Sequence, residues 1–246
     1  MKDTDFTIHD KTLDTPRGRI AFSEFIPESG DKAPCVLMSH GFNSCMGELA
    51  DVAKVLAAHG VAAVCYDFNG GGNKGKSSGK TTDMSVATEQ EDLRDMAAYV
   101  RQQPYAGRLY LYGESQGGFV SALTAPELND ISGLFLVYPA FVIPHDWLSK
   151  SVEELGDEFE FMNVKLSMTY YNGVPRYDVF AKAAEFGGAV KIWHGGADNI
   201  VDPEYSLKLV KSYADCELTV FSGLGHWFPP ELRERIAKEI AGRING

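Results

Sequence analysis

Ser115 has the sequence setting of a nucleophilic serine. The apolar run Leu109–Tyr112 comes directly before its motif, and a segment typical of a helix comes directly after it. In that context a sharp strand-to-helix turn exposes a serine hydroxyl above a sheet. The pattern alone is weak evidence, because a Gly-rich turn with a capping serine matches it too. The motif has the form G-x-S-x-G and reads Gly113-Glu114-Ser115-Gln116-Gly117.

A serine nucleophile needs a general base, and the base needs an acid that orients it. His226 lies in a loop between the last predicted strand and the last predicted helix, where an imidazole can reach the edge of a sheet. Asp198 follows the strand-like run Val190–Trp193 and is the predicted acid. Asp202 is a rival for this role, but it is better explained as a cap for the helix after it. The order Ser115, Asp198, His226 is that of one family of folds.

The oxyanion of an acyl-transfer intermediate needs two preorganised N–H donors. The N–H of Gln116, directly after the nucleophile, is one predicted donor. The other is the N–H of Phe42, in the turn that follows the apolar run Val36–Met38. Among the remaining histidines, His194 stands beside two glycines, where we expect a role in backbone packing.

These residues lie in loops that connect alternating strands and helices. Short apolar runs typical of buried parallel strands alternate with amphipathic segments, of which Ser85–Gln103 is the longest helical one. The alternation predicts an α/β fold: a mostly parallel sheet with helices on both faces and the site at the carboxyl ends of the strands. Two short strands, Phe6–His9 and Arg19–Phe25, precede it. We expect a core formed by residues 1–139 and 177–246, with residues 140–176 as a lid inserted over the site.

The lid segment is rich in aromatic and acidic residues. Its aromatic side chains either contact the substrate or form a small core of the lid itself. The acidic side chains are expected to form one solvated helix face, which would disfavour anionic acyl groups if it bordered the entrance; these are Glu153, Glu154, Asp157, Glu158 and Glu160. The candidates for substrate contact are His40 outside the lid and Asp146, Trp147, Phe161, Tyr170 and Tyr171 within it.

A second motif competes with the serine motif. Residues Gly70–Ser77 match G-x-x-x-x-G-K-S, the phosphate-binding P-loop. A P-loop needs its Lys and Ser on the first turn of a helix, whereas here the helical pattern begins only near Ser85. No predicted strand ends in an Asp suited to hold the magnesium ion. A nucleotide-binding protein is therefore the weaker alternative, as is a non-catalytic protein on the same scaffold.

The composition narrows the class of partner. Asp and Glu outnumber Lys and Arg by 34 to 23, which gives a formal net charge of −11. This charge disfavours nucleic acids and anionic membranes as partners. No apolar run reaches the roughly 20 residues that a transmembrane helix needs. The dispersed cysteines have no metal-type spacing and indicate a reduced, cytoplasmic protein without disulfides; they are Cys35, Cys45, Cys65 and Cys216.

Five motifs together resemble the α/β-hydrolase family, and most of all the small bacterial cinnamoyl (feruloyl) esterases, over the chain from about Phe6. The resemblance implies an eight-stranded, mostly parallel sheet, a Ser–His–Asp triad and an inserted lid that contributes to substrate binding. Three departures stand out: Glu114 replaces the usual His before the nucleophile, the loop after Asp67 is longer, and the lid is short. The motifs are His40-Gly41-Phe42, Asp67-Phe68-Asn69-Gly70, residues 113–118, His194-Gly195-Gly196-Ala197-Asp198 and Gly225-His226.

We therefore expect a serine carboxylic ester hydrolase that works through an acyl-enzyme and needs no metal or organic cofactor. Its expected partner is a small-molecule ester, either a hydroxycinnamate (feruloyl-type) ester or another small ester. Serine peptidases, thioesterases and acyltransferases use the same triad, so these activities stay open.

Overall fold

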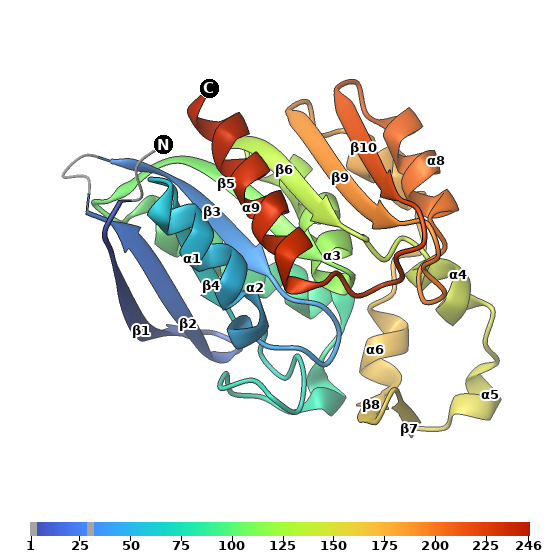
Figure 1. Ribbon diagram of the computed structural model, residues 1–246. Helices are drawn as coiled ribbons and strands as arrows, with labels where there is room; N and C mark the ends of the chain where they lie inside the picture. The colour runs from blue at the N-terminus through green and yellow to red at the C-terminus, as the bar shows by residue number, and fades with distance from the viewer. Residues whose placement is uncertain (1–3, 29–31) are drawn as a thin grey trace.

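The computed structural model describes residues 4–28 and 32–246. Its centre is an eight-stranded sheet in the order β1-β2-β4-β3-β5-β6-β9-β10 (Figure 1). The first two pairings, β1 with β2 and β2 with β4, are antiparallel, and all later pairings are parallel. This confirms the predicted sheet. The strands are β1 (Phe6–Thr15), β2 (Gly18–Pro27), β3 (Ala33–Ser39), β4 (Ala62–Tyr66), β5 (Ala106–Glu114), β6 (Ile131–Val137), β9 (Ala189–Gly195) and β10 (Cys216–Phe221).

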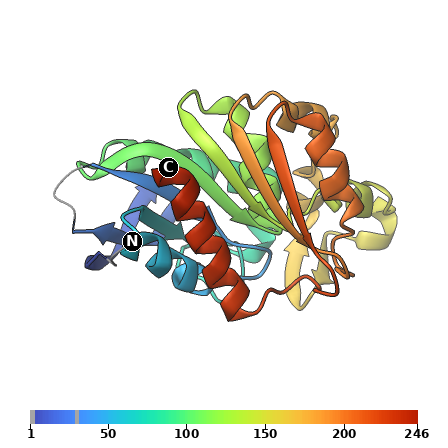
Figure 2. The same cartoon turned by 45° about the horizontal axis from the view of Figure 1, so that its top comes forward.

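Helices cover both faces of this sheet. On one face, α1 (Ala50–Ala58) and α9 (Pro230–Asn245) pack side by side (Figure 2). On the other face lie α2 (Val86–Arg101), α3 (Gln116–Thr124), α7 (Val179–Ala184) and α8 (Glu204–Ser212). Three short 3₁₀ helices, η1 (Met46–Leu49), η2 (Thr81–Asp83) and η3 (Ala125–Glu127), lie in the connections.

Burial on both faces explains why the central strands appear as continuous apolar runs in the sequence. In β3, Cys35 and Leu37 belong to the core under α2 and α3, while Val36 and Met38 belong to the core under α1 and α9. Successive side chains of a strand point to opposite faces, so a strand covered on both faces needs apolar residues at every position. In α2 the apolar residues recur every three or four positions and form one buried face, as the amphipathic pattern of the sequence predicts.

The lid segment has more regular structure than its sequence suggests. It contains α4 (Ile143–Leu148), α5 (Val152–Leu155), the hairpin of β7 (Glu158–Phe161) and β8 (Val164–Ser167), and α6 (Met168–Asn172). The expected single acidic helix face is wrong, because the acidic residues are divided between α5, the following turn and β7. In β7 they alternate with Phe159 and Phe161, which are more buried. The first hairpin, β1–β2, is also longer than predicted, because β1 is an exposed edge strand without an apolar pattern.

Three further features bear on the class of protein. All four cysteines are free thiols, and Cys35 and Cys65 are buried. Within the described residues, no group of three or more His, Cys, Asp or Glu side chains is arranged to hold a metal ion. In the same part of the chain, every helix is too short or too polar to cross a bilayer.

Candidate active site

Ser115 occupies a sharp turn between β5 and α3. Its backbone has φ 51° and ψ −119°, a combination that residues with a side chain rarely adopt. The close approach of neighbouring backbone requires glycine at Gly117, where a Cβ would lie 2.3 Å from the carbonyl oxygen of His40. The turn therefore presents the Ser115 hydroxyl at the carboxyl end of the central strand, as the G-x-S-x-G motif predicts.

The structure brings Ser115, His226 and Asp198 into one hydrogen-bonded chain. The Ser115 Oγ lies 3.0 Å from Nε2 of His226, and Nδ1 of His226 lies 2.7 Å from Oδ2 of Asp198. In a neutral imidazole, Nδ1–H donates to the carboxylate and leaves Nε2 free to accept the serine proton. His226 and Asp198 are buried, being 3% and 6% exposed. Loops after β5, β9 and β10 thus meet at one edge of the sheet.

The Asp198 carboxylate is held in its charged form. Its Oδ1 accepts hydrogen bonds from the N–H groups of Ile200 and Val201, both at 2.9 Å. Burial alone would raise the pKa of Asp198, but hydrogen bonds from His194, His226 and the Val201 N–H bring that pKa below its usual value. A carboxylate that stays ionised can fix the tautomer of His226 and stabilise the imidazolium.

His194 contributes to this site, which the sequence did not indicate. Its Nε2 lies 2.9 Å from the Val201 carbonyl oxygen and 3.2 Å from Oδ2 of Asp198, and its Nδ1 accepts from the hydroxyl of Ser206 at 2.7 Å. The expected role in backbone packing is therefore incomplete, because the ring also supports the acid. Asp202 accepts a hydrogen bond from the N–H of Glu204 at 2.9 Å, as expected of a helix cap.

Glu114 anchors a second hydrogen-bonded network beside Ser115. Its Oε1 accepts from Nη1 of Arg233 at 2.7 Å, and its Oε2 accepts from the hydroxyl of Tyr138 at 3.2 Å. The ring of Tyr138 packs on that of His226, with centroids 4.4 Å apart. Arg233, on α9, also pairs with Asp51 on α1. Glu114 therefore ties both helices of one face to the aromatic ring under the imidazole.

The two predicted oxyanion donors lie in the elements next to Ser115. A Cβ on Gly41 would lie 3.2 Å from Cβ of Ser115, so the turn that carries Phe42 passes directly beside Ser115. Gln116 is the first residue of α3, where an N–H has no partner within the helix. Helix α3 also directs its positive end toward Ser115, which favours negative charge there.

His40 lies beneath this site instead of in it. The side chain is 1% exposed, its Nδ1 donates to the Gly41 carbonyl oxygen at 2.8 Å, and its Nε2 accepts from the Phe68 N–H at 3.3 Å. Burial lowers the pKa of His40, in keeping with a neutral ring. With both nitrogens on the backbone, the ring fixes the turn before Phe42.

A cavity of about 420 Å³ opens over Ser115 and His226. Its lining falls into two parts. The apolar part comprises Phe42, Met162, Ile200, Trp227 and Phe228. The charged part comprises Glu48, Asp51, Glu114 and Arg233. Met162 comes from the β7–β8 turn, so the lid forms one wall of the cavity. A substrate with an apolar portion and a polar, uncharged or cationic portion matches this lining.

None of the six candidates for substrate contact is among the residues that line this cavity in the described chain. Trp147 and Tyr170 are buried and pack on each other, with ring centroids 4.8 Å apart. Phe161 packs on Trp147 and on Phe42. Tyr171 lies under the guanidinium of Arg176, and Asp146 is partly exposed on α4. Most of the lid aromatics thus form the core of the lid.

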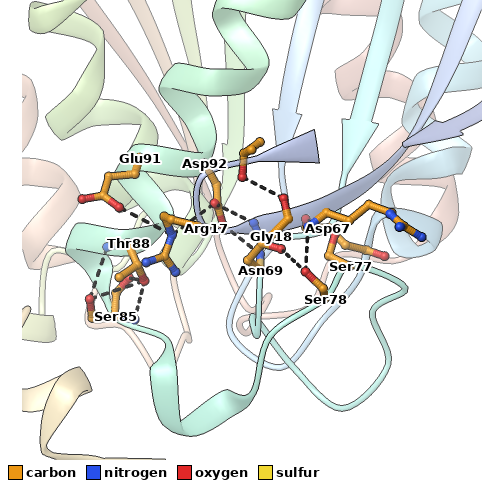
Figure 3. A network of polar contacts seen from close by, with 12 residues as sticks. Arg17, Gly18, Asp67, Asn69, Ser77, Ser78, Ser85, Thr88, Glu91 and Asp92 are labelled. Carbon is orange, nitrogen blue, oxygen red and sulfur yellow. Dashed lines mark hydrogen bonds and ion pairs between the residues drawn. The ribbon is translucent and has the colours of Figure 1, made fainter. Parts of the chain in front are cut away.

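The loop Gly70–Ser77 does not have the structure of a P-loop. No helix begins at Lys76 or Ser77, and its polar groups bond to the protein itself (Figure 3). The Ser77 hydroxyl donates to the Asp67 carbonyl oxygen at 2.6 Å, and the Lys76 N–H donates to Oδ2 of Asp67 at 2.6 Å. The N–H and side-chain amide of Asn69 donate to the buried Asp92 of α2.

This loop instead supports the lid. The Asn73 side chain donates to the Asn163 carbonyl oxygen at 3.1 Å, and the Thr81 hydroxyl donates to the Lys165 carbonyl oxygen at 2.5 Å. The Ser167 hydroxyl closes the contact by donating to a carbonyl oxygen of η2. The extra length of the loop after Asp67 therefore has a structural role, since it carries the β7–β8 hairpin.

The chain is similar to known proteins in sequence. The family described as serine aminopeptidase, S33, matches residues 30–174, more than half of the chain. Caffeoylshikimate esterase of Arabidopsis thaliana is 30% identical over an alignment 146 residues long, which covers 54% of this chain and 41% of that protein. The matched part thus spans about two fifths of that curated relative.

It is also similar to solved structures. Est1E of Butyrivibrio proteoclasticus with bound ferulic acid superimposes with a TM-score of 0.87 at 24% identity, covering 95% of this chain and 98% of that one. A putative hydrolase of Agrobacterium vitis S4 gives a TM-score of 0.78 at 22% identity, with 98% and 99% covered. These likenesses confirm the predicted fold class and the resemblance drawn from the motifs.

Proposed function

We propose that this chain, which belongs to the serine aminopeptidase S33 family of α/β hydrolases, is a serine hydrolase that cleaves small carboxylic esters. The observation that carries the proposal is the continuous hydrogen-bonded chain from Ser115 through His226 to Asp198. A serine held within hydrogen-bonding distance of a carboxylate-oriented imidazole is an activated nucleophile.

The reaction proceeds in two acyl transfers. Oγ of Ser115 attacks the ester carbonyl while His226 accepts its proton, and the N–H groups of Phe42 and Gln116 hold the oxyanion. His226 then protonates the departing alcohol, which leaves an acyl-enzyme on Ser115. Water, deprotonated by His226, releases the acid and restores the serine. Loss of one oxyanion donor typically costs about 3–4 kcal/mol of barrier. Asp198 stays ionised throughout.

The substrate class we propose is an ester of an aromatic or short aliphatic acid, with hydroxycinnamate esters as the first choice. The apolar cavity wall of Phe42, Met162 and Trp227 suits a flat aromatic acyl group. Two of the similar proteins point the same way: one is named for a caffeoyl ester, and the other has ferulic acid bound. No metal or organic cofactor enters the reaction.

Ser115→Ala tests the chemistry. We expect a folded protein whose turnover of p-nitrophenyl acetate falls by at least about 1,000-fold. A fluorophosphonate probe, which labels activated serines, should modify the wild type and not the variant. Circular dichroism serves as the control for folding. Wild-type turnover in a folded Ser115→Ala protein would contradict the assignment.

A serine aminopeptidase is the second candidate, because the matched family carries that description. On the cavity wall the carboxylates of Glu48, Asp51 and Glu114 outnumber the one guanidinium, that of Arg233, and this excess of negative charge suits an ammonium group. A panel of methyl ferulate, p-nitrophenyl esters, an acyl-CoA and aminoacyl amides separates the candidates. We expect the highest kcat/KM for an ester. A higher value for the amides would favour the peptidase, and one for the acyl-CoA a thioesterase or an acyltransferase.

A cytoplasmic location completes the proposal. It is supported by the four unpaired cysteines, two of them buried and behaving as small apolar side chains. The net charge of −11 further supports a small-molecule partner over a nucleic acid or an anionic membrane.

A further inference from the structure

The side chain of Gln116 is held between the lid and the core. The hydroxyl of Tyr170, on α6 of the lid, donates to Oε1 of Gln116 at 2.6 Å. Nε2 of Gln116 donates in turn to Oε2 of Glu89, on α2, at 2.8 Å. All three residues are buried. A hydrogen-bonded chain therefore runs from the lid, through the residue after the nucleophile, into the core.

Tyr170 also contacts the other oxyanion residue. Its ring lies edge-on to that of Phe42, with centroids 6.1 Å apart, and Phe161 from β7 packs on Phe42 at 5.4 Å. One lid side chain thus touches both residues whose N–H groups are to bind the oxyanion. Tyr170 and Phe161 do not line the cavity, so these two lid side chains reach the site through Phe42 and Gln116.

The position of Tyr170 depends on how the lid is packed. Trp147 lies 4.8 Å from the Tyr170 ring and 5.0 Å from Phe161. The hairpin that carries Phe161 is in turn bonded to the loop of residues 70–83. Aromatic pairs of this kind fix ring orientation as well as burying apolar area. A shift of the lid would therefore move the Tyr170 hydroxyl relative to Gln116.

Burial restricts the hydrogen-bonded chain of Tyr170, Gln116 and Glu89. It also raises the pKa of Glu89, although the hydrogen bond from Gln116 has the opposite effect on that pKa. An amide whose two ends both have buried partners cannot rotate without leaving a buried polar atom unsatisfied, and such an atom is costly. Gln116 is thereby fixed at both ends of its side chain, directly beside Ser115.

We propose that Tyr170 and Glu89 are positioning residues of the oxyanion hole, which hold Gln116 from opposite sides and make acyl transfer depend on the packing of the lid. This inference rests on the proposed esterase function. It gives Tyr170 a role through Gln116 and Phe42, whereas the sequence left open whether its ring contacts the substrate or belongs to the core of the lid.

Tyr170→Phe is the sharpest test, because it keeps the ring against Trp147 and Phe42 and removes only the hydroxyl. On p-nitrophenyl butyrate we expect kcat to fall about ten-fold while KM stays within about two-fold, the pattern of an interaction used in the transition state. Tyr177→Phe is the matched control, since Tyr177 is half-exposed and lies outside the lid and the cavity. It should leave both constants unchanged.

The inhibition constant of a trifluoromethyl ketone separates a role of Tyr170 in the oxyanion hole from a role in protein stability alone, because the second would leave this constant unchanged. Ser115 adds to its carbonyl and forms a stable oxyanion, so the inhibitor reports on the oxyanion hole. In Tyr170→Phe its inhibition constant should rise by the same factor by which kcat/KM falls. An inhibition constant that stays at the wild-type value while kcat falls would overturn the inference.

Glu89 tests the opposite end. Glu89→Ala leaves Nε2 of Gln116 without its acceptor and should lower kcat about as much as Tyr170→Phe, whereas Glu89→Gln keeps an acceptor and should recover most of that loss. Both residues act on one amide. The fold-loss of kcat in the double variant, Glu89→Ala with Tyr170→Phe, should therefore be smaller than the product of the losses in the two single variants. Independent effects that multiply in full, or wild-type kcat in both single variants, would overturn the inference.

Different results would contradict the esterase function and the positioning role of Tyr170 and Glu89. If the wild type hydrolyses no ester and its serine is not labelled, the proposed function fails. If the wild type is active and labelled but Tyr170→Phe matches it in kcat, only the inference about Tyr170 and Glu89 fails.

Discussion

Ser115 combines a strained backbone with the hydroxyl that we propose as the nucleophile. Its positive φ of 51° costs a residue with a Cβ about 1–3 kcal/mol, and the surrounding strand, helix and glycines hold it in place. The same turn aims Oγ at Nε2 of His226. The stability of the sheet and its helices thus holds Ser115, which is partly exposed, in this conformation at the end of the strand.

The strain predicts a difference between two inactive variants. Ser115→Gly and Ser115→Ala both remove the hydroxyl, but only glycine adopts a positive φ without cost. We expect the glycine variant to have the higher Tm, by about 2–4 °C for about 1 kcal/mol in a chain of this size. Differential scanning calorimetry of the two proteins measures it. Equal melting temperatures, or a lower one for the glycine variant, would argue against strain at this position.

The residues that stand in recognisable motifs could be predicted from the sequence, whereas the side chains that contact and support them could not. Ser115, Asp198 and His226 stand in loops directly after apolar runs, which is a local signal. The pairing of Glu114 with Arg233 joins positions 119 residues apart, and the contact of His194 with Asp198 depends on how the loop after β9 folds back. Such contacts follow from tertiary packing, which no local pattern encodes.

Among the elements, the β7–β8 hairpin departs most from expectation. Its two turn residues, Met162 and Asn163, both have positive φ, 49° and 61°, and close the pair Phe161–Val164. Asn suits such a turn, whereas Met does not. The alternation of Glu158, Phe159, Glu160 and Phe161 was a strand signal with a period of two, which the dense acidic charge concealed. Met162 is exposed and lines the cavity, so its place in the turn serves the site.

The unfavourable conformation of Met162 predicts that its replacement by glycine increases the stability of the protein and weakens its binding of substrate. Met162→Gly should raise the Tm, because glycine relieves the strain at positive φ. It should also raise KM for methyl ferulate about five-fold, because the cavity loses an apolar wall. Steady-state kinetics and calorimetry measure the two effects.

Asn163→Gly is the control for this pair. It lies next to Met162 in the same turn, does not line the cavity, and uses only its carbonyl oxygen to bond to Asn73. It should leave KM unchanged. A KM for Met162→Gly equal to that of the control would show that the lid turn does not contact the acyl group.

At the scale of the whole molecule, charge and architecture act together. The parallel order of the strands was predictable because strands buried on both faces leave continuous apolar runs. The net charge of −11 was likewise evident from composition. Composition does not show where the charge gathers. On the cavity wall the three carboxylates of Glu48, Asp51 and Glu114 outnumber their two cationic partners, Arg233 in the wall and Lys74, which pairs with Glu48.

This charge distribution predicts selectivity that depends on ionic strength. At about 10 mM salt, where screening is weak over about 30 Å, kcat/KM for an anionic succinate ester of p-nitrophenol should be several-fold lower than for the neutral butyrate ester. At about 1 M salt the screening length falls to about 3 Å, and the two values should converge. Initial rates across a salt series measure this. If the ratio of the two kcat/KM values does not change with salt, the selectivity is caused by the shape of the cavity and not by its charge.

The order of the strands divides the three proposed catalytic residues between the middle of the sheet and one of its edges. Ser115 follows β5, near the middle of the sheet, whereas His226 follows the edge strand β10 and Asp198 follows β9, the strand next to that edge. Outer strands fray at lower free energy than inner ones. Under mild denaturing conditions we therefore expect His226 to separate from Ser115 first, so that the proposed hydrolysis stops while most of the sheet is still folded and resumes when β10 pairs again.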